Sequence, residues 1–139
     1  MAIEFALMGP VLVLMLMAAT DMALAIHARA EVGNAARAGA QYAAINGFNS
    51  SGITSAVANA TSLPGVTAAP APSTFCGCAT ASGITQQTCG TTCAAGGSTG
   101  TYVTVTAQAN YSPVFPTRWN AYLVHNFVNL SATETQRTN

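Results

Sequence analysis

An uncharged, strongly apolar run near the N-terminus constrains this chain more than any other feature. It extends from Phe5 to Thr20 and is followed by Asp21. A helix over residues 3–22 would reach about 30 Å, the hydrocarbon thickness of a bilayer. Asp21 opposes insertion by about 3 kcal/mol at a membrane centre and by less near an interface. We therefore expect a retained membrane helix with Asp21 near one interface.

Two other interpretations of the apolar run remain. A cleavable secretory signal has a basic segment before a shorter apolar core, but no Lys or Arg precedes Arg29. A buried core helix would require one small domain of 139 residues to enclose many large apolar side chains. The membrane helix fits the sequence best.

The helix is expected to continue well past the apolar run. Residues 18–45 are rich in alanine and contain no proline, which gives high helix propensity. Asn46 and Gly47 form a C-terminal stop signal, whereas Pro10 should kink or locally open the helix. Such a helix is about 65 Å long. One small domain cannot cover it, so its small-residue faces should contact other helices.

The remainder, residues 47–139, is expected to form an extracytoplasmic domain. Ser50 or Ser51 could cap a short helix at about residues 51–61. Alternating apolar and polar residues predict antiparallel strands at about 101–111 and 124–136. In the first strand, one face carries Val103, Val105, Ala107, Ala109 and Tyr111.

Between these strands, Pro113 and Pro116 predict a loop, and its aromatic residues predict a plug in the core. The fold class is therefore α+β, with a long N-terminal helix followed by a small antiparallel β-sheet domain.

Four cysteines lie close together in the predicted domain, at Cys76, Cys78, Cys89 and Cys93. Their spacing differs from the usual zinc pattern, and an even number outside the cytoplasm is typical of disulfides. The first two share one side of a strand, and Ser82-Gly83 can turn the chain back in a hairpin over 73–93. We expect two disulfides. Both connectivities that cross the hairpin remain open.

Composition argues against several functions. Only 6% of the residues are charged, against about 25% in an average soluble domain, and none lies between 38 and 117. Nucleic-acid binding requires a basic stripe, which is missing. The four acids are poorly placed for paired-carboxylate chemistry, and His27 and His125 are solitary. We therefore expect no catalytic site, no cofactor, no metal and no nucleic-acid partner.

Several segments are similar to one known family. The segment AIEFALMGPVLVLMLMAATDMALAIHARAEVGNAARAGAQYAA resembles the N-terminal helix of TadE-like pilins, the minor or pseudopilin class of the tight-adherence (Tad/Flp, type IVc) pilus system. FCGCATASGITQQTC resembles the family's cysteine-rich hairpin, TYVTVTAQANYSPVFP its penultimate strand and proline turn, and LSATETQR its closing strand. The resemblance covers nearly the whole chain and implies a type IV pilin-like fold.

The resemblance also implies how such a chain is processed. A prepilin peptidase removes a short basic leader from these proteins, so this chain is expected to be the mature form. Glu4 matches the glutamate that pilins keep behind the new N-terminus, although it is fourth here rather than fifth. In a filament its carboxylate can neutralise the α-amino group of a neighbour. Alternatively, Glu4 is an interfacial charge that marks the membrane edge.

For function, the resemblance implies a structural pilin subunit. The subunit would first be a single-pass protein of the inner membrane, and assembly machinery would then polymerise it with copies of itself into an extracellular filament for adhesion. A minor pseudopilin that primes or tips another pilin's filament is one alternative. A membrane-anchored extracytoplasmic binding module is the other.

Six residues of the long helix are candidates for assembly. Four of them carry charges without clean i, i+4 partners of opposite sign, so we expect those partners in neighbouring subunits. The six candidates are Glu4, Pro10, Asp21, Arg29, Glu31 and Arg37.

Overall fold

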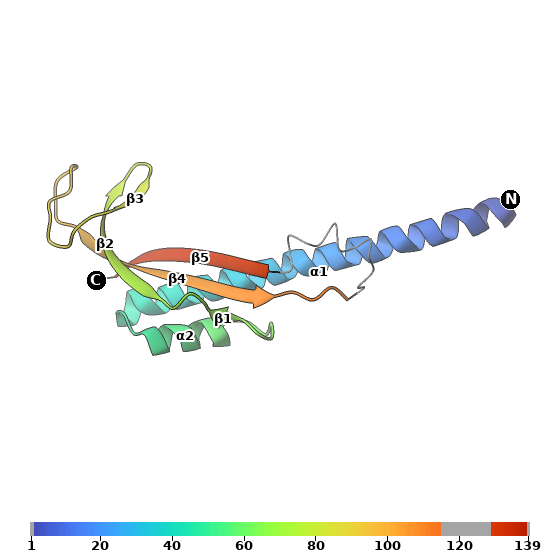
Figure 1. Cartoon of the computed structure of the whole chain (residues 1–139), viewed down its shortest axis with the longest axis horizontal. Coiled ribbons are helices and arrows are strands. Elements are labelled where there is room, and N and C mark those ends of the chain that lie inside the picture. Colours follow the sequence, from blue (N-terminus) through green and yellow to red (C-terminus); the bar gives the residue numbers. More distant parts are fainter. Residues whose placement is uncertain (1, 115–128, 139) are drawn as a thin grey trace.

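The computed structural model describes residues 2–114 and 129–138, with side chains from residue 6 onward. It confirms the predicted α+β layout, in which a long helix precedes an antiparallel sheet with two disulfides (Figure 1). The elements in chain order are α1 (Ala2–Asn46), α2 (Ser50–Asn59), β1 (Thr67–Ala68), β2 (Ser73–Thr80), β3 (Gly83–Gln86), β4 (Gly100–Asn110) and β5 (Asn129–Thr138).

Helix α1 is continuous over its 45 residues. Pro10 lies inside it and removes one backbone donor, but the predicted opening does not interrupt the helix. The predicted stop is confirmed, because α1 ends at Asn46 and Gly47 adopts a φ of +77°. The N-terminal part of α1 projects beyond the rest of the molecule, and the C-terminal part lies against the sheet (Figure 1).

Helix α2 is the predicted short helix, with a different cap. Asn49 is the N-cap residue, and its side-chain oxygen accepts the backbone N–H of Gly52 at 3.1 Å. The expectation that Ser50 or Ser51 caps the helix is therefore wrong. Asparagine caps as well as serine does, and here it precedes both serines.

Strand β4 is the centre of the sheet. Ten antiparallel residue pairs join it to β5, from Thr101–Thr138 to Asn110–Asn129. On its other side β4 pairs with β2 and, further along, with the two-residue strand β1. Strand β2 then turns into β3, and pairing of Thr80 with Gly83 confirms the predicted turn.

The core lies between one face of this sheet and the two helices. Val103, Val105, Ala107 and Ala109 are buried on β4, as the alternating pattern predicted, and Leu130 joins them from β5. Ile53 and Val57 of α2 complete the apolar cluster, together with small residues of α1.

Gly39 is the point of closest approach in this core. A Cβ atom at Gly39 would lie 2.6 Å from Cγ2 of Val57 and 2.9 Å from Cγ1 of Val105. Real side chains do not tolerate such distances without a shift of their neighbours. The missing side chain therefore lets α1, α2 and β4 pack together.

Several predicted features lie outside the described residues. They are the aromatic plug with Phe115, Trp119 and Tyr122, the proline at 116, His125, and the first part of the strand expected at 124–136.

Candidate assembly interface

Helix α1 divides into two parts according to its surroundings. In the exposed half, residues 6–20, no described side chain is buried, and Leu7, Leu12 and Leu16 are 63–71% exposed. By length and composition, α1 is long and apolar enough to cross a membrane. Lipid or other helices must cover this surface if it is to leave water.

The covered half, residues 21–46, has one buried stripe. Its members recur every three or four residues, as expected for one face of a helix, and all but one are alanine, glycine or valine. The stripe comprises Asp21, Ala25, Ala28, Val32, Ala35, Ala36, Gly39, Ala40 and Ala43. This face packs against β5, β4 and α2.

Asp21 lies where the exposed half meets the covered half. Its side chain is fully buried, and its carboxylate accepts the backbone N–H of Val114 at 3.0 Å. The hydroxyl of Tyr111 donates to the main-chain carbonyl of Asp21 at 3.3 Å. Burial, and secondarily the negative charge of Asp21, raise the pKa of Tyr111 above its ordinary value. The segment after β4 is thus attached to the helix at the first buried position.

Two further charges of α1 also have partners within the chain. The hydroxyl of Thr61 donates to the carboxylate of Glu31. Nε of Arg37 lies 3.1 Å from Oε1 of Glu134, in a partly exposed ion pair. Asp21, Glu31 and Arg37 therefore each have a partner within the chain, and contacts with neighbouring subunits stay a prediction.

The sequence could not reveal these contacts, because the paired residues are far apart along the chain. The separations are 93 residues for the Asp21 contact, 30 for Glu31 and 97 for Arg37. An i, i+4 pattern detects only partners on the same helix.

Arg29 differs from these residues. It borders an open groove of about 560 Å³ between α1 and β5, and among the described residues it has no acidic partner. Pro10 is exposed in the apolar half. The backbone of Glu4 lies near the start of α1, and its side chain is outside the described part.

Strands β2 and β3 turn at the opposite end of the molecule from the N-terminus (Figure 1), and β2 carries two of the four cysteines. The disulfides join Cys76 to Cys89 and Cys78 to Cys93, with Cα–Cα distances of 5.1 and 5.7 Å. This pairing selects one of the two connectivities left open by the sequence. Both bonds tie the segment after β3 to strand β2.

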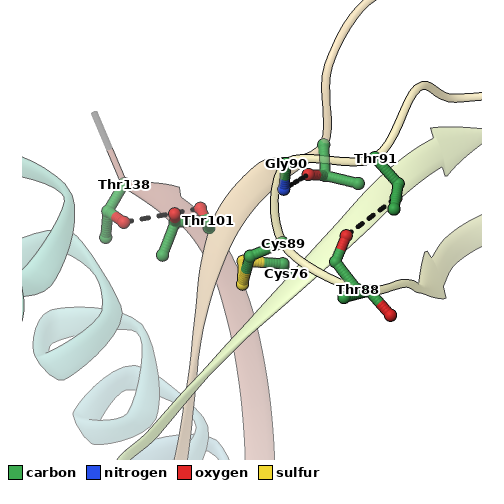
Figure 2. The surroundings of a disulfide bond; sticks show 8 residues. Cys76, Thr88, Cys89, Gly90, Thr91, Thr101 and Thr138 are labelled. Atoms are coloured by element: carbon green, nitrogen blue, oxygen red, sulfur yellow. Dashed lines mark hydrogen bonds between the residues drawn. A yellow bond between two sulfur atoms is a disulfide. The ribbon is translucent and has the colours of Figure 1, made fainter.

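Figure 2 shows how the loop beside the first disulfide is folded. The hydroxyl of Thr91 donates to the carbonyl of Thr88 at 2.7 Å, and the N–H of Gly90 donates to the hydroxyl of Thr99 at 2.9 Å. The cysteines therefore stabilise the far end of the domain and take no part in the exposed half of α1. Within residues 2–114 and 129–138, no group of three or more His, Cys, Asp or Glu residues could hold a metal ion.

Comparison with known proteins finds a similarity in helix α1. A family model described as TadE-like protein matches residues 1–41, which include the exposed half and most of the covered half of α1. No curated protein and no solved structure shows significant similarity to the chain. Over residues 1–41 the chain is therefore similar to the TadE-like family, in agreement with the resemblance suggested by the sequence, and this similarity associates the helix with the Tad pilus system in general.

Proposed function

We propose that this chain is a structural pilin subunit that polymerises through α1 into a Tad-type bacterial surface filament, which serves in adhesion. The observation that carries the proposal is the exposed half of α1. Fifteen consecutive helical residues, 6–20, project from a folded domain, and none of their side chains is buried. An apolar surface of this kind is covered by lipid or by other protein.

The proposed mechanism has two stages. The helix first holds the subunit in the inner membrane, after a prepilin peptidase has removed a leader, with the domain outside the cytoplasm. Assembly machinery then extracts the subunit, and the exposed half exchanges lipid for the helices of neighbouring copies. Its apolar surface stays out of water in both stages, so the exchange costs little hydrophobic free energy.

A second candidate is a minor pseudopilin that primes or tips a filament built from another pilin. The TadE-like match favours this candidate, because the resemblance is to the minor or pseudopilin class. A subunit with a long helix and its own β-sheet domain could build a filament alone, which favours the main pilin.

Electron microscopy of sheared filaments would separate these roles. The probe is an antibody against residues 73–136, and the control is a strain that lacks the chain. Label spaced continuously along filaments is the expected result, and label confined to tips would instead indicate the minor pseudopilin. Recovery only as a detergent-extracted monomer would contradict polymerisation and favour a membrane-anchored binding module.

A further inference from the structure

We propose that the groove between α1 and β5 binds the N-terminal helix of a second copy of this chain, with Arg29 facing Glu4 of that copy. The inference rests on the proposed function, because it requires that copies associate. It goes further by assigning the acceptor surface, the axial offset between two subunits and one ion pair.

The shape of the groove suits a helix. Ala30 and Gly33 of α1 and Ala132 of β5 contribute small side chains to its lining. A Cβ atom at Gly33 would meet nothing within 4 Å, so the helix surface there is open. The lining residues of α1 extend over residues 26–37, about 16 Å or three turns. Small side chains over that length allow the backbone of a second helix to approach closely.

The second copy supplies a segment of the required kind. In the described part of the chain, residues 6–20 are a helical segment exposed on every side, and they are predominantly apolar. The groove lies on the other half of the same helix. If two copies lie parallel and one is shifted lengthwise along the direction of the helices, the exposed half of one therefore lies against the covered half of the other. Subunits that leave one membrane in the same orientation meet in this parallel arrangement.

Charge fixes the displacement. Asp21, Glu31 and Glu134 each accept a hydrogen bond within their own chain. The remaining acid is Glu4, in the helical part that projects from the domain, whereas Arg29 borders the groove without an acidic partner among the described residues.

An offset of 25 residues brings the two charges to the same level. At 1.5 Å per residue this is a displacement of about 37 Å. Residues 2–12 of the second copy then lie along the groove, and the rest of its exposed half lies beside residues 38–45. The groove also carries polar and charged side chains, among them Arg37 and Glu134, so the contact is only partly apolar and the pair of Arg29 with Glu4 sets its register.

Site-specific cross-linking in assembled filaments tests this arrangement. The photoreactive residue p-benzoylphenylalanine replaces Asn34, an exposed residue that lines the groove. The matched control places it at Ser55, an exposed residue of α2 that does not line the groove. After irradiation, mass spectrometry identifies the linked peptides. We expect the probe at position 34 to link to residues 2–12, and the probe at position 55 not to.

Such a link must join two copies. Within one continuous helix, residue 34 is about 33 Å or more from residues 2–12 at 1.5 Å per residue. Filaments whose position-34 probe links to other segments, or to none, would overturn the inference. If the probe at position 34 prevents assembly, Ala30, which is exposed and also lines the groove, takes its place.

Charge substitutions at Arg29 provide an independent test. Arg29→Glu should lower filament yield by about tenfold or more, because it opposes like charges, and Arg29→Lys should leave the yield nearly unchanged. Equal yields from the two variants would refute the ion pair. Failure of the unsubstituted chain to form filaments would instead refute the proposed function, so the two failures are distinguishable.

Discussion

The two halves of α1 reverse the usual relation between side-chain size and burial. Large apolar residues occupy the exposed half, where Leu14 is 61% exposed, whereas the covered half is buried mainly through alanine and glycine. Soluble domains generally bury their large apolar residues. In this helix, small residues allow close packing against the chain's own sheet. Large residues are placed where another apolar phase or another copy must cover them.

The change from one half to the other occurs at a single residue. Every described position before Asp21 is exposed or only partly buried, and Asp21 itself is fully buried. A carboxylate held by the segment after β4 thus marks the end of the exposed half. The comparison can be tested by making equivalent changes on the two sides of this boundary.

The largest effect should come from placing an acid in each half. Ala36→Asp buries a charge in the core and should lower the free energy of unfolding by about 4 kcal/mol or more. Leu14→Asp should change it by less than about 0.5 kcal/mol, because Leu14 is 61% exposed. Urea unfolding in detergent, followed by near-ultraviolet circular dichroism, measures both. Equal destabilisation would mean that the exposed half contributes to the domain's core.

The two glycines of the covered half should respond in opposite directions. Gly39→Ala forces a methyl group against Val57 and Val105 and should cost about 1–3 kcal/mol of stability. Gly33→Ala meets nothing and should stabilise the helix by up to about 1 kcal/mol through higher helix propensity. The same unfolding measurement compares them. A stabilised Gly39→Ala variant would contradict the close packing of α1, α2 and β4.

Removing the carboxylate at the boundary should have an intermediate effect. Asp21→Ala leaves the N–H of Val114 without its acceptor and should cost about 1–3 kcal/mol. Met22→Ala, at the exposed neighbouring position, is the control and should change stability by less than about 0.5 kcal/mol. Hydrogen exchange at the amide of Val114 should accelerate in the Asp21 variant alone. Unchanged exchange would show that Asp21 does not hold this segment.

The smallest effect should appear only at alkaline pH. The raised pKa of Tyr111 means that above about pH 10, its ordinary value, the folded chain retains a proton that the unfolded chain has lost. Its contribution to stability is therefore complete below pH 10 and is lost as the pH rises through the folded-state pKa. Tyr111→Phe should reduce this alkaline loss in urea titrations at several pH values. The same loss in both proteins would assign it to other groups.

Local sequence patterns predicted the parts of the fold that depend on local properties. The helix stop at Asn46-Gly47, the buried face of β4 and the turn at Ser82-Gly83 all follow from backbone preferences or period-two alternation. The features that could not be predicted depend on tertiary structure. The partner of Asp21, the disulfide connectivity and the two-residue strand β1 depend on segments brought together by folding.

The candidate interface was predictable to a similar extent. The apolar run identified the exposed half, because its length and composition are readable without any contact. The groove beside Arg29 was not predictable, since one of its walls comes from β5, about a hundred residues later in the chain.

The pairing of β4 with β5 has a mechanical consequence. Both strands lie alongside the covered half of α1, and ten residue pairs join them (Figure 1). A pull along the helix axis therefore loads the hydrogen bonds between these strands in shear. All ten pairs share the force at once, whereas a perpendicular pull would open them one after another. A chain built this way resists tension best in the direction in which its helix points.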